Sequence, residues 1–292
     1  MTKKRAIIIS IIISVLILLF VLLGAIFCVR QQDVVFIGDR SANTLDITND
    51  QLIESAGIKN GRSIFTIDKD DAIANIEHTY PYIKVIQINT VSPMRIEICV
   101  RERVEMFYAE NISRDKYYIL DEEMKVLRID TELPTGLSQI IPHLLGDEAK
   151  ESILGISGNT VAGDFLSNEH YRDLTYNTFV AIYKTVMIDG KYLDRDDIKG
   201  LIINLQFGTG YTEYGSYDRV IMSTNLGFTI DIGKPDADLE RKVNTCFSAI
   251  GPLVEAGKSN GSIRVFYYVN DNGEELESIS YFESEDATND LE

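Results

Sequence analysis

The sequence predicts an α+β protein with a single N-terminal transmembrane helix, a small β-α-α-β-β domain and a mixed α/β domain whose sheet is mostly antiparallel. Three observations support this fold class. Residues 6–29 are continuously apolar, residues 33–102 combine short strands with capped helices, and residues 103–282 continue with strands, turns and amphipathic helices. A chain of 292 residues is long enough for about two domains, each with its own core.

The apolar run from Ala6 to Val29 contains no charged side chain. At about 1.5 Å per residue, a helix of this length covers a bilayer core of about 30 Å. The run is too long for a removable signal peptide, and Phe27 is too bulky to precede a lipidated Cys28. Three basic residues at positions 3–5 place residues 1–5 in the cytoplasm, because basic residues stay on the inner side. We therefore expect a single-pass type II protein of the cell membrane.

The composition is acidic, with 45 Asp and Glu residues against 28 Lys and Arg residues and a net charge of −17. With the three basic residues inside, the outer part carries −17 − 3 = −20. This charge excludes nucleic acid as a ligand and argues against adhesion to anionic lipid headgroups or an acidic wall polymer. Three cysteines do not make a disulfide scaffold, and we expect no bridge between Cys99 and Cys246, which fall in different predicted domains.

The first outer domain is predicted over residues 33–102. Its expected elements are a strand at 34–37, a helix from Thr48 to Gly57, a helix from Asp68 to just before Pro81, and strands at 85–91 and 95–100. Thr48 and Gln51 have the spacing of a capping box, and Asp68 is a favourable N-cap. The two later strands alternate apolar and polar residues. We expect two short helices on one face of a three-stranded sheet.

The second domain is predicted over residues 103–282. Its expected elements are a strand-turn-strand at 117–127, a helix at 168–187, a strand at 201–207, hairpin strands at 218–223 and 228–232, a helix from Pro235 to about Glu255, and strands at 263–269 and 276–282. Gly208-Thr-Gly210 is interpreted as a turn after a strand. Residues 283–292 contain five acidic residues and no basic one, which is typical of a disordered tail.

Several short segments match a known family in order and spacing. They are Val35-x-Ile-Gly38, Gly57-Ile-x-x-Gly61-x-x-Ile-Phe65-x-x-Asp68, Pro81-Tyr-Ile83, Ser92-Pro93, Val100-Arg-Glu-Arg103, Tyr117-Tyr-Ile-Leu-Asp121 and Ile141-Pro142-x-Leu-Leu-Gly146. Directly after a predicted span, this series resembles the FtsQ/DivIB family of bacterial cell-division proteins, in which a POTRA domain precedes a β domain. Two residues depart from the family pattern: Val104 stands where Pro is expected, and Met124 occupies a turn position where Gly is usual.

The resemblance implies a non-enzymatic membrane scaffold at the division septum. It implies partners of the FtsB/DivIC and FtsL type, and help in recruiting or regulating the septal peptidoglycan synthase. We expect no cofactor, metal or small-molecule substrate. His78, His143 and His170 are far apart in sequence, and Gly155-Ile-Ser157-Gly158 lacks the second spacer of a nucleophile elbow.

The C-terminal segment 263–282 is rich in aromatic residues. Some of them are expected to fill the core face of a terminal hairpin, whereas the last strand is expected to form a sheet edge that accepts an extended partner segment. The residues predicted to bind the partner are Tyr268, Leu276, Ile279, Tyr281 and Phe282. For the first domain we keep two interpretations open: an edge that docks other division proteins, or a passive spacer.

Two other functions are compatible with a membrane-tethered outer chain. A POTRA-containing transport or assembly component would chaperone unfolded chains by strand addition, and it would carry several POTRA units or a barrel. An exported hydrolase held by an uncleaved signal would carry convergent His, Ser or carboxylate residues. The sequence contains one POTRA-like unit and no such cluster in close sequence spacing, which favours the scaffold.

Overall fold

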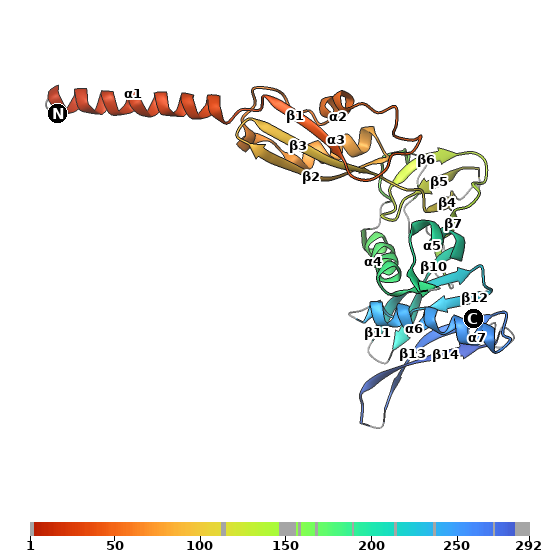
Figure 1. Ribbon diagram of the computed structural model, residues 1–292. Coiled ribbons are helices and arrows are strands. Elements are labelled where there is room, and N and C mark those ends of the chain that lie inside the picture. The colour runs from red at the N-terminus through yellow and green to blue at the C-terminus, as the bar shows by residue number, and fades with distance from the viewer. Residues whose placement is uncertain are drawn as a thin grey trace. The chain divides into compact units, whose positions relative to one another are not determined.

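The computed structural model describes residues 3–111, 115–145, 156, 159–166, 169–188, 190–212, 215–235, 238–270 and 272–283. The chain forms two compact units, Met1–Arg103 and Val104–Glu292. Helix α1 (Lys3–Ile26) opens the first unit (Figure 1). None of the helices in the described residues is both long and apolar enough to cross a membrane. The predicted acidic tail beyond Glu283 and the Ser157-Gly158 pair lie outside the described residues.

The remainder of the first unit has the predicted order of strands and helices. Its elements are β1 (Gln31–Phe36), α2 (Asn49–Ser55), the 3-10 turn η1 (Ile64–Thr66), α3 (Lys69–Thr79), β2 (Ile83–Ser92) and β3 (Arg95–Glu102). Strand β3 lies in the centre of the sheet, parallel to β1 and antiparallel to β2. The first strand begins earlier than predicted because Gln31 already pairs with Arg95 at the start of β3.

Both helix caps of this unit form as the sequence predicts. The Gln51 amide donates to the Thr48 hydroxyl at 3.3 Å, and the Thr48 amide donates to the Gln51 side chain at 2.8 Å. The Asp68 carboxylate accepts from the amides of Asp70 and Asp71 at 3.1 Å each. These caps satisfy amides that the first helical turn leaves without a partner.

The helices and the sheet of the first unit enclose one apolar core. Its fully buried members include Leu52, Ile76, Ile83, Ile96, Ile98 and Val100. An ion pair lies beside this core, with the Arg103 Nη2 at 2.6 Å from the Glu77 Oε2. The second Glu77 oxygen accepts from the Val85 amide at 2.9 Å. Helix α3, strand β2 and the end of β3 are therefore connected by one buried carboxylate.

The described residues of the second unit form a nine-stranded sheet. Its strands are β4 (Phe107–Glu110), β5 (Tyr117–Leu120), β6 (Val126–Asp130), β7 (Ser138–Leu145), β10 (Ile202–Thr212), β11 (Gly215–Thr224), β12 (Phe228–Asp231), β13 (Gly261–Val269) and β14 (Glu275–Phe282), in the spatial order β14-β13-β12-β11-β10-β7-β4-β5-β6. The pairs β4–β7, β7–β10 and β12–β13 are parallel and the others are antiparallel. The prediction of a mostly antiparallel sheet in a mixed α/β unit is confirmed.

In the part of the chain that the structure describes, four helices accompany this sheet, and two predictions about this region are wrong. They are α4 (Glu169–Thr185), α5 (Arg195–Leu201), α6 (Leu239–Ser248) and α7 (Ile250–Glu255); a small ribbon of β8 (Met187–Ile188) and β9 (Lys191–Tyr192) follows α4. The single helix expected from Pro235 to Glu255 is two helices. Pro252 has no amide hydrogen to donate to the Ser248 carbonyl, which accounts for the interruption there. Leu201, expected in a strand, ends α5.

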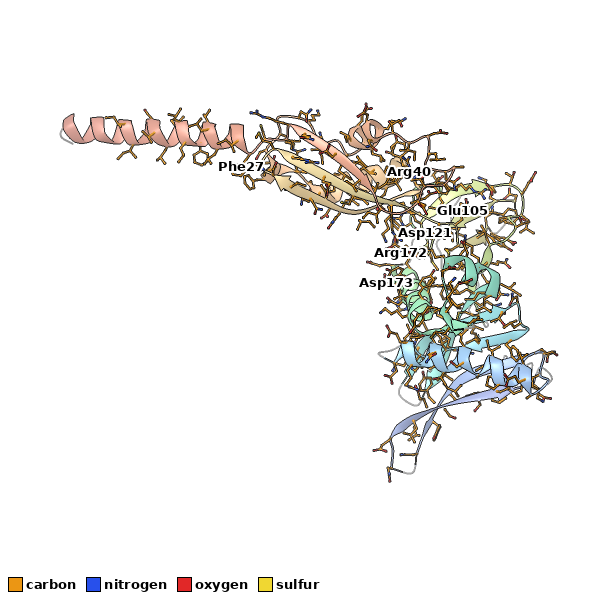
Figure 2. The ribbon with its side chains drawn as sticks, viewed as in Figure 1. Phe27, Arg40, Glu105, Asp121, Arg172 and Asp173 are labelled. Carbon is orange, nitrogen blue, oxygen red and sulfur yellow. The ribbon has the colours of Figure 1, made fainter. Side chains whose placement is uncertain are left out.

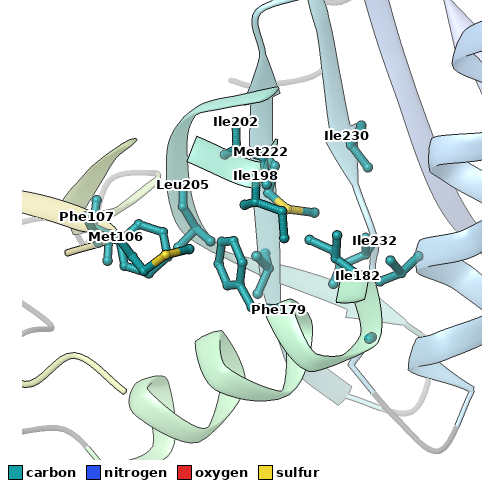
Figure 3. Close-up of a cluster of buried hydrophobic side chains, with 14 of the residues drawn as sticks. Met106, Phe107, Phe179, Ile182, Ile198, Ile202, Leu205, Met222, Ile230 and Ile232 are labelled. Carbon is teal, nitrogen blue, oxygen red and sulfur yellow. The ribbon is translucent and has the colours of Figure 1, made fainter. Parts of the chain in front are cut away.

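The core of the second unit lies between the sheet and its helices. Figure 3 shows Phe179 and Ile182 of α4 directed at Leu205, Met222 and Ile230 of neighbouring strands. Phe107 and Phe179 pack with ring centroids 4.8 Å apart. All of these side chains are buried. The apolar stripe of α4 therefore fixes this helix against the sheet, as its sequence spacing predicts.

Two local features of the second unit concern backbone conformation. Met124, in the turn between β5 and β6, has a φ of 58°, which is the left-handed conformation that Gly usually adopts. The turn therefore keeps this conformation with Met in place of Gly. The predicted turn at Gly208-Thr-Gly210 is wrong, because both glycines lie within β10 and pair with β11. A Cβ on Gly210 would lie 2.3 Å from the Tyr217 ring, so this glycine makes room for a cross-strand tyrosine.

Candidate partner-binding surface

The hairpin β13–β14 forms one edge of the large sheet. Strand β13 pairs with β12 only over Gly261–Arg264, whereas its pairing with β14 runs from Ser262↔Phe282 to Val269↔Glu275. The distal part of the hairpin thus extends beyond β12 (Figure 1). Strand β14 is the terminal strand of the described sheet, so its outer backbone groups are available for pairing with another extended segment.

Asn270 shapes the turn of this hairpin. Its side-chain oxygen accepts from the amides of Asn272 and Glu274 at 3.0 and 2.9 Å. Its side-chain nitrogen donates to a Glu274 carboxylate oxygen at 2.9 Å. Gly273 adopts a φ of 78°, which a side chain at this position would disfavour. The turn therefore fixes the register of β14 against β13 through local interactions.

The five residues predicted to bind a partner are divided between the two faces of the hairpin. Ile279 pairs with Val265 and Tyr281 pairs with Ile263, and all four pack on the core of the second unit. The Tyr281 hydroxyl also donates to the Asn260 carbonyl at 2.7 Å. Ile279 and Tyr281 therefore contribute to the attachment of β14, and their predicted contact with a partner is untested.

The opposite face of the hairpin carries Tyr268, Leu276 and Phe282, together with Phe266 and Arg264. We call these five residues the outer hairpin face. Tyr268 and Leu276 are a cross-strand pair, with 51% and 38% of their surface exposed. Phe282 packs edge-on against Phe266, with centroids 5.2 Å apart. The Arg264 guanidinium lies 5.5 Å from the Phe282 ring centre. The Arg264–Phe282 contact was not predicted from the sequence. The two-residue period of a strand does place Arg264 on the same face of β13 as Phe266.

Charged residues hold the inner face of the hairpin to α6. The Lys242 ammonium is fully buried and donates to the Tyr267 hydroxyl and the Lys234 carbonyl, each at 2.8 Å. It also lies 3.4 Å from a Glu277 oxygen of β14. Arg241 hydrogen-bonds the same carboxylate, and this bond raises the pKa of Arg241. Strand β14 is thus attached by a buried charge as well as by apolar packing.

The histidines form no arrangement of acid, base and nucleophile within the described part of the chain. His170 lies 2.5 Å from Asp218, which also accepts from the Tyr171 hydroxyl at 3.2 Å. Burial raises the pKa of Tyr171 to about 12, so its phenol stays protonated well into the alkaline range. His78 lies on α3 in the other unit. The described residues also contain no group of three side chains suited to hold a metal ion.

The comparisons with known proteins agree with the fold of the first unit. The family model described as "POTRA domain, FtsQ-type" matches residues 42–103. The chain is 32% identical over 111 residues to "Cell division protein DivIB" from two Clostridium botulinum strains, which covers 38% of this chain and 41% of those proteins. It is 35% identical over 83 residues to the DivIB protein of Clostridium acetobutylicum, covering 28% and 32%.

The chain thus covers at most 41% of the length of these relatives. The matched POTRA segment contains the two capped helices and the β2–β3 pair described above. Segments quoted from the sequence for the family, from Gly57 to Arg103, lie in it as well. Residues 42–103 therefore resemble an FtsQ-type POTRA domain, and over part of its length the chain is similar to DivIB cell-division proteins.

Proposed function

We propose that the protein is a non-enzymatic scaffold of the bacterial division machinery, which binds partners of the FtsB/DivIC and FtsL type and so supports septal peptidoglycan synthesis. The FtsQ-type POTRA match and the DivIB relatives support the role in cell division. The outer hairpin face and the edge of β14 support the mode of binding. We assign no chemical reaction to the protein.

In this proposal an extended segment of the partner adds to the sheet beside β14. Backbone hydrogen bonds to β14 supply affinity, and side chains of the partner contact Tyr268 and Leu276. Large, partly exposed aromatic side chains contribute strongly to such interfaces. The attachment of β14 through Glu277 and Ile279 orders the strand before the partner arrives, which reduces the entropy lost on binding.

We also propose that α1 anchors the protein in the cell membrane with the N-terminus in the cytoplasm. Large apolar side chains from Ile11 to Leu23 are exposed along this helix, and the sequence from Ala6 to Val29 has no charge. Three basic residues precede it, as the orientation requires. Confinement to the membrane plane raises the effective concentration of other membrane-bound division proteins, so modest interfaces are sufficient.

A binding measurement with paired variants tests the scaffold. The full chain, reconstituted in lipid nanodiscs, is titrated with the outer segment of a DivIC-type partner. Changing both Tyr268 and Leu276 to Ser should weaken binding by about 2 kcal/mol, which corresponds to roughly 30-fold in Kd. Val254→Ser, at a half-exposed apolar residue of α7, is the matched control and should leave Kd unchanged. Equal Kd values for all three proteins would contradict this binding site.

Hydrogen exchange distinguishes strand addition from side-chain contact alone. Amides of β14 should exchange more slowly when the partner is bound, because some of them gain hydrogen-bond acceptors. Strand β6, at the opposite end of the same sheet, serves as the internal control and should not change. Protection of both terminal strands, or of neither, would reject strand addition at β14.

A further inference from the structure

An apolar surface surrounds the point where the chain leaves α1. Phe65 of η1 is 76% exposed, although it is among the largest apolar side chains of the first unit. Val91 and Met94, at the turn between β2 and β3, are also exposed. We name residues 27–32, 59–67 and 91–95 the helix-exit face. Exposed apolar side chains concentrated in one place indicate a contact surface.

Backbone hydrogen bonds hold these three segments together. The Ile64 amide donates to the Phe27 carbonyl at 3.0 Å, and the Val29 amide donates to the Arg62 carbonyl at 2.9 Å. The Gly61 amide returns a bond to the Val29 carbonyl at 2.7 Å. The Phe27 and Phe65 rings pack with centroids 5.3 Å apart. Phe65 is therefore fixed next to the first residue after α1 (Figure 2 labels Phe27).

The β2–β3 turn joins the same face. The amides of Arg30 and Gln31 both donate to the Met94 carbonyl, at 2.9 and 3.1 Å. Because Met94 contacts residues only four and five positions beyond Ile26, the turn lies close to the helix end. An apolar surface thus continues from the side chains of α1 onto the folded domain.

The charge of the helix-exit face is opposite to that of the whole protein. Its three segments contain the basic residues Arg30, Lys59, Arg62 and Arg95 and no acidic residue, in a chain with a net charge of −17. Arg95 is ion-paired with Asp33, one residue beyond the face, so the positive charge of the face comes from the other three. Arg30, Lys59 and Arg62 are exposed. The acidity of the outer chain argues against general adhesion to anionic lipid, but the fold gathers basic residues at one site. Basic and aromatic residues around an apolar surface are typical of contact with lipid headgroups.

We propose that the helix-exit face inserts into the interfacial layer of a phospholipid bilayer. Phe65 reaches the boundary of the acyl chains, Val91 and Met94 lie at the same depth, and Arg62 and Lys59 contact lipid phosphates. This inference rests on the proposed function of α1 as a membrane anchor, because the anchor brings the face to the lipid surface. It gives the POTRA domain a second attachment, so the domain is held at the membrane rather than pivoting about Phe27.

Tryptophan fluorescence can test the depth of each site, because the chain contains no Trp. Three variants of the full chain each receive a single Trp, at Phe65, at Leu45 or at Phe20. They are reconstituted in phosphatidylcholine–phosphatidylglycerol vesicles with or without brominated acyl chains, which quench nearby Trp. Leu45 is the matched control, with 63% of its surface exposed. Leu45 lies in the loop that contains Ser41 and Thr44, and both of these residues hydrogen-bond Glu102 at the other end of β3. Arg40, which Figure 2 labels, belongs to the same loop and donates to the Ile47 carbonyl.

The expected order of quenching is Phe20→Trp, then Phe65→Trp, with Leu45→Trp unaffected. Bromolipid should reduce the emission of Phe65→Trp about twofold or more, since an interfacial side chain lies about 5–10 Å into the boundary. Quenching of Phe20→Trp without Phe65→Trp would overturn the lipid contact while leaving the anchor intact. A lack of quenching at Phe20 would reject the anchor itself, and the lipid contact with it.

A charge variant provides a second measurement. Adding Arg62→Glu to Phe65→Trp should reduce quenching in vesicles that contain anionic lipid, because the basic contribution to the interface is reversed. In vesicles of phosphatidylcholine alone, the same substitution should have a smaller effect. If Arg62→Glu has the same effect in both lipids, or none in either, the assignment of Arg62 to lipid phosphates is wrong.

Discussion

Glu77→Gln should destabilise the POTRA domain more than any exposed charge substitution in it. The Glu77 and Arg103 side chains are only 9% and 2% exposed, and their nitrogen–oxygen distance is 2.6 Å. The glutamine retains an oxygen that can accept from the Val85 amide, so the hydrogen bond to β2 need not be lost. The principal change is the removal of the negative charge that faces a buried guanidinium.

The magnitude follows from this burial. Removing one partner of a buried ion pair costs about 3–5 kcal/mol, because the other charge stays buried without its counter-charge. A small domain has a total stability of about 5–15 kcal/mol, so the variant should lose a substantial part of it. Replacing both residues with apolar ones, as in Glu77→Leu with Arg103→Met, should recover most of the loss.

Urea unfolding followed by hydrogen exchange of α3 and β2 peptides isolates this domain from the second unit. Asp33→Asn is the matched control, because Asp33 and Arg95 also lie 2.6 Å apart but are partly exposed to solvent. Exposed pairs contribute little to stability. We expect a large decrease in the unfolding midpoint for Glu77→Gln and a small one for Asp33→Asn. Equal shifts for the two variants would refute the reasoning from burial.

Two further predictions concern the second unit. Gly261→Ala should detach the end of β14 and weaken partner binding. Gly261 has a φ of 144°, and an added Cβ would lie 2.3 Å from the Tyr281 ring and 2.5 Å from the Phe282 carbonyl. Gly251→Ala, where the added Cβ meets open space, is the control. Burial raises the pKa of Tyr217 to about 12 from its usual 10, so the folded chain favours the neutral phenol. The stability that this preference contributes is complete below pH 10 and is lost as the pH rises through 12. The stability of the second unit, measured by urea unfolding, should therefore fall over this range, and less steeply in Tyr217→Phe.

The elements of the first unit could be predicted because local rules determine them. Thr48 with Gln51, and Asp68 alone, begin helices through hydrogen bonds within three residues along the chain. The alternation in β2 and β3 reflects one buried face. The start of β1 at Gln31 could not be predicted, because its pairing with Arg95 depends on a residue more than sixty positions away.

The second unit shows where such rules are insufficient. Asp194 and Asp197 form a capping box for α5, a local helix signal that directly precedes the apolar run predicted as a strand. The two glycines of β10 indicated a turn by composition, yet pairing with β11 and the space required by Tyr217 keep them in a strand. For β10, the decisive information is the cross-strand register with β11.

The candidate site was predicted as a segment, but its two faces have different physical roles. A strand that accepts another chain must already be ordered, because ordering it during association would reduce affinity. In β14 this order comes from Ile279 and Tyr281 in the core and from Glu277 beside the buried Lys242. The exposed Tyr268–Leu276 pair can then act as a preformed contact. In the proposed complex, substitutions at Ile279 or Tyr281 should therefore lower affinity by loosening β14, and their direct contact with a partner stays a prediction. Sequence composition grouped them with the outer residues because both sets are apolar or aromatic.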